Sequence, residues 1–299
     1  MKKLFRNCLV ITLLFTACVS NNKEQQGSDS ISVENPEEYN LSKPEILEDY
    51  ILALDSTDVG SVGKATAKFK ELFEQKESSE NDKGVSIIMD YIDKVSMYAN
   101  RSVFEEDINY RPLVNIEFDG GKAAVPSDLE DVYEKINNNG FRVREAEGMF
   151  DLQPNPIYFQ DNFYPYITSD FEILLQQLGR DNMEGYASDA AIAIPFQSLV
   201  QRTVWYEDFA NKTKGTTAGD LAKKEYEKYF TTLTIGMDNT PAIESQQASP
   251  YFQEAYTYLK DFAPNSETYK KLEAYIALLQ EQKIDEAKAL VPNLIGKSL

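Results

Sequence analysis

The sequence contains no histidine, and its two cysteines, Cys8 and Cys18, both lie near its start. A domain built from the residues after Cys18 therefore cannot form disulfide bonds, and it lacks the cysteine and histidine ligands that structural zinc sites need. Serine–histidine–aspartate and cysteine–histidine catalysis are excluded as well. Since 42% of the residues are hydrophobic, we expect an apolar core to hold the domain together. Any catalysis would depend on carboxylates, lysine, tyrosine or a serine–lysine pair.

The net charge of the chain is strongly negative, −19 at pH 7. So acidic a protein repels phosphate backbones, and no nucleic-acid partner is expected. The charge is compatible with divalent cations or basic partners, although solubility alone explains it. With roughly 280 residues after an N-terminal signal, the chain has room for one large domain or two small ones.

Residues 1–18 have the pattern of a secretory signal: basic residues, then an apolar run from Cys8 to Phe15, then Thr16 and Ala17 before Cys18. The segment from Leu14 to Cys18 resembles the lipobox of bacterial lipoproteins. That resemblance implies that residues 1–17 are removed as a signal peptide and that Cys18 carries acyl chains such as palmitate. The alternatives are an ordinary cleaved signal and a spanning helix, for which the run is shorter than the ~20 apolar residues required.

Residues 18–40 are predicted to form a lipidated, flexible tether, because their polar composition cannot bury enough apolar surface to become ordered. Val19 differs from the Asp that retains lipoproteins of enteric bacteria in the inner membrane. Lys23 and Glu24 resemble the short charged tags that direct some Bacteroidota lipoproteins to the cell surface. These resemblances predict a cell-envelope protein anchored in the outer membrane bilayer through acylated Cys18, on the periplasmic face or at the cell surface.

The rest of the chain is predicted to be mainly α, with helical hairpins packed antiparallel and a small β element around residues 112–160. Apolar residues recur at helical spacing in three stretches, and a charged loop over residues 77–82 separates the last two. Together these stretches predict an N-terminal helical subdomain over residues 41–108. The residues of the three stripes are Ile46, Leu47, Tyr50, Ile51 and Leu54; Val62, Ala65, Phe69, Leu72 and Phe73; and Val85, Ile88, Ile92, Val95 and Ala99.

The β element is predicted from two stretches that alternate between apolar and polar residues. Residues 110–118 are expected to form a strand that ends in a turn at 119–121, and residues 141–159 to form one or two strands that pair with it. Capping boxes are predicted at Ser127 and at Ser169, each a serine followed three residues later by glutamate. The helix after Ser169 is expected to stop at Gly179.

Residues 109–299 are predicted to form an α-rich main domain, which could also be one unit with residues 41–108. Successive helical hairpins are expected over 196–211, 219–235, 250–262, 267–282 and 285–295. The tripeptide Asp-Phe-Ala recurs at Asp208 and Asp261, and the hairpins loosely resemble tetratricopeptide units. Only two weak copies are present, fewer than the three that a stable array needs, so ordinary antiparallel packing is the alternative.

Aromatic residues are dense between Tyr158 and Tyr166, beside Asp161 and Asn162, in what we expect to be a loop. Such rings could stack on sugars or grip a peptide, but aromatic residues anchor cores just as readily. The same two interpretations hold for the single tryptophan. The residues proposed as ligand contacts are Tyr158, Phe163, Tyr164, Tyr166 and Trp205.

Carboxylates are the remaining candidates for catalytic residues. Glu145 and Glu147 would share one face of a strand, but a glycosidase needs two acids that flank the substrate bond, so ion pairing on the strand is the simpler interpretation. Glu147 and Glu172 are the candidate acids if the protein is an enzyme. The turns at 119–121 and 238–241 lack the spaced acids of an EF-hand, and no nucleotide, dinucleotide or nucleophile-elbow motif is present. We predict no metal and no cofactor.

These observations favour a non-enzymatic lipoprotein that binds an envelope protein or a glycan. One alternative is a carboxylate-only, muramidase-like enzyme that acts on glycan, which would need an acid with a raised pKa in an apolar cleft. The other is a lipoprotein that captures glycans for import.

Overall fold

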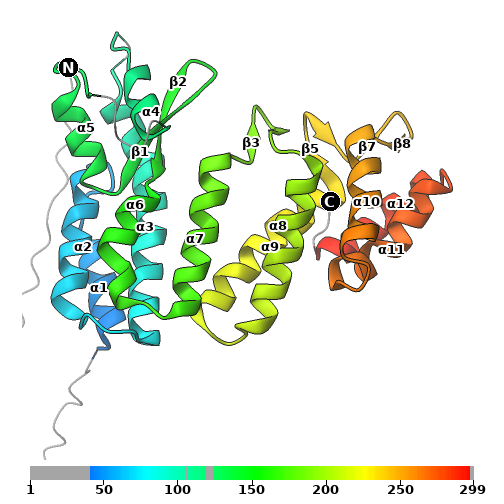
Figure 1. The fold of residues 1–299 in the computed structure, drawn as a ribbon, viewed down its shortest axis with the longest axis horizontal. Coiled ribbons are helices and arrows are strands. Elements are labelled where there is room, and N and C mark those ends of the chain that lie inside the picture. The colour runs from blue at the N-terminus through cyan, green and yellow to red at the C-terminus, as the bar shows by residue number, and fades with distance from the viewer. Residues whose placement is uncertain (1–40, 106, 119–123, 297–299) are drawn as a thin grey trace, which may run out of the picture. The chain divides into compact units, whose positions relative to one another are not determined.

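Helices dominate the fold, which confirms the mainly α prediction (Figure 1). The computed structural model describes residues 41–105, 107–118 and 124–296. Cys18 and the predicted tether lie outside these residues. The helices are α1 (Lys43–Leu52), α2 (Gly60–Leu72), α3 (Ser79–Val103), α4 (Arg111–Phe118), α5 (Glu130–Asn137), α6 (Pro156–Phe163), the 3-10 helix η1 (Tyr164–Tyr166), α7 (Ser169–Glu184), α8 (Phe196–Lys212), α9 (Thr217–Ile235), α10 (Pro250–Phe262), α11 (Glu267–Gln280) and α12 (Ile284–Ile295).

The strands form separate two-stranded antiparallel hairpins. Only the first is more than a pair of two-residue strands, and it is the one that contributes to the candidate site. The hairpins are β1 (Phe141–Ala146) with β2 (Met149–Pro154), β3 (Ala187–Ser188) with β4 (Ala191–Ile192), β5 (Gly236–Met237) with β6 (Thr240–Pro241), and β7 (Ile243–Glu244) with β8 (Gln247–Ala248).

The long helix α3 is central to the first part of the fold, because it packs against α1, α2, β2 and α9. Its predicted apolar stripe, from Val85 to Ala99, is fully buried. A loop separates α2 from α3 as predicted, but it ends earlier than residue 82, since α3 already begins at Ser79. The Ser78 side chain accepts hydrogen bonds from backbone N–H groups of the first turn, and acidic residues in that turn suit the helix dipole.

The strand predicted over residues 110–118 is wrong, because Arg111–Phe118 is helix α4. The buried residues Tyr110, Leu113 and Ile116 are three apart, which is helical spacing. Pro112 lies in the first turn, where its missing N–H costs no hydrogen bond. The turn predicted at 119–121 lies outside the described residues.

The strands predicted over 141–159 exist, but they pair with each other as β1 and β2 and not with residues 113–118. Glu147 and Gly148 form the connecting turn, both with positive φ, as a two-residue hairpin turn requires. Pro156 then begins α6, capped by the side chain of Asn155. The aromatic stretch from Tyr158 to Tyr166 is therefore helix, not loop.

Both capping boxes predicted in this region are displaced. Helix α5 begins at Glu130 after Leu129, which makes no side-chain cap, so Ser127 plays no capping role. The cap of α7 is Thr168, one residue before the predicted Ser169. Helix α7 also continues past Gly179 to Glu184. A side chain at Gly179 would meet Pro156 of α6 at 3.1 Å, so this glycine serves close packing of the two helices.

Helices α8 to α12 agree with the predicted ranges to within two residues at each end. Helices α8 and α9 pack along each other, as do α11 and α12 (Figure 1). The short hairpins from β3 to β8 lie in the connections before α8 and α10; their two-residue strands are below what a sequence pattern can signal. Residues 41–299 form one compact unit, and a boundary near residue 108 stays a prediction.

Candidate functional site

A cavity of about 510 Å³ lies between α3, α6, α7, α9 and the β1–β2 hairpin. Its volume falls within the ~300–1,000 Å³ range of small-molecule sites. One part of its wall is apolar, with Phe159 of α6 and Leu175 and Leu178 of α7. The charged part of the wall comes mainly from α3, β1 and α9, and the remaining lining residues are apolar or neutral. Apolar surface combined with a few polar groups is the usual composition of a ligand site.

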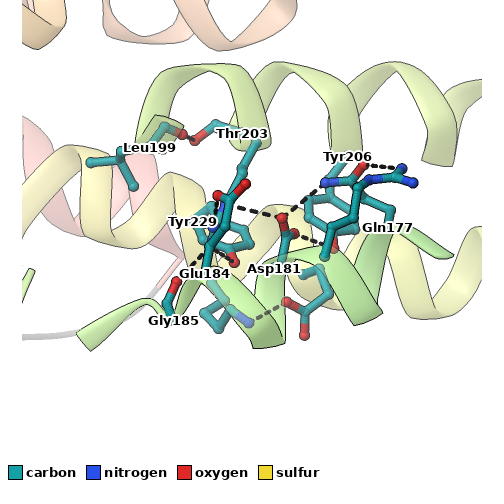
Figure 2. A network of polar contacts seen from close by, with 12 residues as sticks. Gln177, Asp181, Glu184, Gly185, Leu199, Thr203, Tyr206 and Tyr229 are labelled. Atoms are coloured by element: carbon teal, nitrogen blue, oxygen red, sulfur yellow. Dashed lines mark hydrogen bonds and ion pairs between the residues drawn. The ribbon is translucent and has the colours of Figure 1, made fainter. Parts of the chain in front are cut away.

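A closed polar network, shown in Figure 2, joins α7, α8 and α9 and borders the cavity through Asp181 of α7 and Tyr229 of α9. Arg202 of α8 is 4% exposed. Its Nε lies 3.0 Å from Oδ1 of Asp181, and its terminal nitrogens donate to Glu184, to the Gly185 carbonyl and to the Tyr229 hydroxyl. The Tyr206 hydroxyl donates to Oδ2 of Asp181 at 2.7 Å. All three nitrogens of the guanidinium group thus have partners.

Burial sets the protonation behaviour of this network. It raises the pKa of Asp181, while hydrogen bonds from Tyr206 and Gln177 and the charge of Arg202 oppose the shift. Burial also raises the pKa of the Tyr206 and Tyr229 hydroxyls, and the charge of Asp181 adds to both shifts. Both tyrosines are therefore neutral hydrogen-bonding groups at neutral pH.

Helix α3 presents Asp90 and Asp93 to the cavity, three residues apart on adjacent turns. Neither side chain has a hydrogen-bond or ion-pair partner within the described part of the chain. Asp93 is open to solvent, yet protein atoms crowd around it in the cavity wall. This crowding raises its pKa to about 6, with smaller contributions from the negative charges of Asp90 and Glu225 and an opposing one from Lys228.

Helix α9 presents Lys224, Glu225 and Lys228 to the same cavity. Glu225 and Lys228 form an ion pair. The Lys228 ammonium also lies 4.7 Å from the ring centre of Tyr229 and 5.5 Å from that of Tyr186, within range of cation–π attraction. Lys224 has no ion-pair partner among the residues that the structure describes.

Strand β1 presents Arg144 to the cavity. One terminal nitrogen donates to Asp151, directly opposite on β2, at 2.9 Å. The Nε is buried and has no hydrogen-bond partner. A guanidinium group has five N–H donors, so Arg144 keeps unused donor capacity where Arg202 has little.

The site is suited to holding a ligand by charge and apolar contact. Carboxylates on α3 could receive a cation, and Arg144 and Lys224 could receive an anion. Within residues 41–105, 107–118 and 124–296, no three acidic side chains come together as a metal site would require.

The residues predicted as ligand contacts are distributed over other parts of the fold. Phe163 is fully buried, with its ring 5.3 Å from that of Phe69. Tyr164 and Tyr166 are half-buried and pack against the core, and Trp205 stacks on Phe209 on α8. These positions are also those of core anchors, and binding by these residues stays a prediction.

Tyr158 borders a second cavity, of about 440 Å³, between α2 and α6. Its hydroxyl donates to Thr66 at 2.8 Å. Asp161 and Asn162 also line this cavity, and Asn162 accepts a hydrogen bond from Lys70. The structure thus brings together Tyr158 with its polar sequence neighbours but separates it from Trp205.

The carboxylates considered from the sequence do not line the larger cavity. Glu147 is exposed at the tip of the β1–β2 turn, and Glu172 accepts a hydrogen bond from Gln176 on the surface of α7. Glu145 pairs with Arg111 of α4. In the turn that begins at Asp238, the Asn239 side chain donates to the Asp189 carbonyl.

Sequence reasoning missed the residues that the cavity does bring together. Asp90 and Asp93 occupy polar positions between the buried residues of α3, where a charged residue normally faces water. In the network beside the cavity, Arg202 could have been noticed, because a charged residue within the apolar stripe of a predicted helix indicates a buried charge.

Comparison with protein-family models, with curated proteins and with solved structures finds no match. Across the described part of the chain, each helix is too short or too polar to cross a bilayer.

Proposed function

We propose that this protein is a lipid-anchored binding protein of the bacterial cell envelope, which holds a small ligand in the cavity between α3, α7 and α9 without transforming it. The observation that carries the proposal is the cavity itself. It combines an apolar wall with charged groups that have no hydrogen-bond or ion-pair partner among the described residues, namely Asp90, Asp93 and Lys224. Unpaired charges at a concave apolar surface are more useful to a ligand than to the fold.

The anchoring half of the proposal rests on residues 1–18, whose lipobox-like segment ends at Cys18. Several acyl chains give stable anchoring because each buried methylene contributes about 0.8 kcal/mol. The test is metabolic labelling of the full-length protein with a fatty-acid analogue, followed by membrane fractionation. We expect label and an outer-membrane location in the natural protein and neither in the Cys18→Ala variant. An unlabelled natural protein would refute the anchor.

The binding half is tested by filling the cavity. Leu178 lines the cavity, while Ile173 lies on the same helix and is 45% exposed outside it. Full-length protein is screened by thermal shift against small envelope metabolites, peptides and sugars. We expect Leu178→Trp to abolish any stabilisation and Ile173→Trp to retain it. Stabilisation that survives in Leu178→Trp would place the ligand elsewhere.

A second candidate function, a carboxylate-only enzyme acting on glycan, is favoured by one observation. Asp93 has a pKa raised to about 6 and shares its cavity with Glu225, and a raised acid beside a second carboxylate is the arrangement that general acid catalysis uses. Turnover of cell-wall glycan that falls about 10²-fold or more in Asp93→Asn would support it. Absence of turnover in the natural protein would exclude it.

A further inference from the structure

The charged groups of the larger cavity do not cancel one another. Glu225 pairs with Lys228, and Asp181 with Arg202. These pairs leave Asp90 and Asp93 on α3 and Lys224 on α9 without partners among the described residues. The cavity therefore presents unbalanced charge of both signs, on separate elements.

The acidic side of the cavity is suited to an ammonium group. Asp90 and Asp93 are adjacent carboxylates of like charge, a pairing that is unfavourable on a helix until a cation joins it. The charged neighbours of Asp93 are Asp90, Glu225 and Lys228, so negative charge is in excess there. The Lys228 ammonium already occupies the faces of Tyr229 and Tyr186, so a ligand ammonium would bind on the side of Asp90 and Asp93.

The basic side of the cavity is suited to a carboxylate. Among the described residues, Arg144 makes one side-chain hydrogen bond, from a terminal nitrogen to Asp151. Its Nε is buried out of a ligand's reach, but the side chain as a whole is 39% exposed, so the terminal nitrogens keep donor capacity that a ligand can use. The planar guanidinium group matches the two oxygens of a carboxylate, and Lys224 adds a second positive charge to the cavity.

We propose that the cavity binds a zwitterion, either an amino acid or a short peptide with a free amino group and a free carboxylate. The ammonium group pairs with Asp90 and Asp93, the carboxylate pairs with Arg144 and Lys224, and an apolar side chain lies against Phe159, Leu175 and Leu178. This inference rests on the proposed binding function and specifies its ligand class.

The test uses the dipeptide leucyl-leucine, its N-acetylated form and its C-terminal amide. The two modified forms keep the apolar contacts and each remove one charge. Binding to the full-length protein in detergent is measured by isothermal titration calorimetry at pH 7. We expect leucyl-leucine to bind, and each modified form to bind at least about tenfold more weakly, the size of one lost charge-assisted hydrogen bond.

Paired variants assign each end of the ligand. The double variant Asp90→Asn with Asp93→Asn should no longer distinguish leucyl-leucine from its N-acetylated form. The double variant Arg144→Gln with Lys224→Gln should no longer distinguish leucyl-leucine from its amide. The control is Asp208→Asn with Lys223→Gln, which changes exposed charges on α8 and α9 outside the cavity and should preserve both preferences.

The outcomes separate this inference from the proposed function. Equal binding of all three forms would overturn the zwitterion while leaving a binding protein. The same holds if no dipeptide form binds at millimolar concentration, but another class of compound stabilises the natural protein and not Leu178→Trp. If nothing binds and Leu178→Trp behaves as the natural protein does, both proposals fail.

Discussion

Two arginines beside the same cavity are used in opposite ways. Arg202 is 4% exposed, and all three of its nitrogens have partners. Arg144 has a side chain that is 39% exposed, makes one hydrogen bond to Asp151 and keeps a buried Nε without a partner. The first is the centre of a closed network that joins α7, α8 and α9. The second belongs to an open rim, together with Asp90, Asp93 and Lys224, and this rim is where we place the ligand.

The comparison of the two arginines shows that polar residues near a cavity are not equally informative about function. A buried charge with complete hydrogen bonding positions helices, and it offers little to a ligand. A charge without a partner at the edge of an apolar cavity contributes little to stability and is free to meet a ligand.

Replacing each arginine by methionine should show the largest difference between the two in the free energy of unfolding. In Arg202→Met, Asp181 is left buried without its positive partner, and we expect the free energy of unfolding to fall by about 3–5 kcal/mol. Arg144→Met breaks only a partly exposed pair and should cost less than about 1 kcal/mol. Urea unfolding of both variants measures the difference. Equal losses would mean that the rim is as structural as the network.

The hydroxyl of Tyr206 should matter nearly as much to the closed network. This buried side chain donates to Asp181 at 2.7 Å, so Tyr206→Phe leaves a carboxylate oxygen with one partner fewer. We expect a loss of about 1–3 kcal/mol in urea unfolding. Tyr258→Phe is the control, because the Tyr258 hydroxyl accepts a hydrogen bond from the exposed Gln201 side chain and has no other side-chain partner among the described residues. This variant should change the free energy of unfolding by less than about 0.5 kcal/mol.

The rim should show its role in the pH dependence of binding. The pKa of Asp93 is about 6, so protonation between pH 7 and pH 5 removes the charge that meets the ammonium group, while the ligand's own charges persist. The affinity for leucyl-leucine should fall about tenfold over this range. Calorimetry on Asp93→Asn should show a much flatter profile. An identical slope in the variant would remove Asp93 from the ammonium site.

The Asp93 carboxyl should also have a small effect on stability, in the opposite direction: lowering the pH weakens ligand binding but stabilises the fold. A carboxyl whose pKa is raised on folding binds its proton more tightly in the folded state than in the unfolded state. The ionised Asp93 therefore lowers the free energy of unfolding fully above pH 6, and this loss disappears towards pH 4. Asp93→Asn should therefore be more stable than the natural protein at pH 7, by less than about 1 kcal/mol because solvent screens the side chain. The gain should vanish near pH 4. Thermal unfolding at both pH values measures it, with Asp208→Asn as an exposed control.

Sequence reasoning succeeded where local signals were sufficient. Pro250 begins α10 as predicted, and the apolar stripes of α2 and α3 face the core. In the stripe of α1, Leu47 and Ile51 are buried but Tyr50 is 37% exposed. It failed at residues 110–118, where a nine-residue run fits both the helical and the strand period, and tertiary contacts of Tyr110, Leu113 and Ile116 decide for helix. It also failed at α6, since Pro156 begins that helix instead of preventing it.

The candidate site could not have been predicted in this way. Asp90 and Asp93 have the pattern of solvent-facing residues on an amphipathic helix, and Arg144 has that of a strand-face ion pair. Their common role arises only when α9 and the β1–β2 hairpin pack around α3. The aromatic residues from Tyr158 to Tyr166, which stand out in the sequence, form α6 and η1 and pack largely against the core.

The sequence sets the chemistry available to this protein: without histidine, and without cysteine after Cys18, the domain has no disulfide, no zinc site with cysteine or histidine ligands and no imidazole base. It also determined the helical class, because the apolar spacing that buries one face of a helix is a local property of the chain. Which charges are buried in a closed network and which are left open to the cavity depends on how the helices pack together. The partners of Arg202 lie in or directly after other helices, at Glu184, Gly185 and Tyr229, whereas Arg144 meets only its hairpin neighbour Asp151 among the described residues, and no local sequence pattern distinguishes these two outcomes.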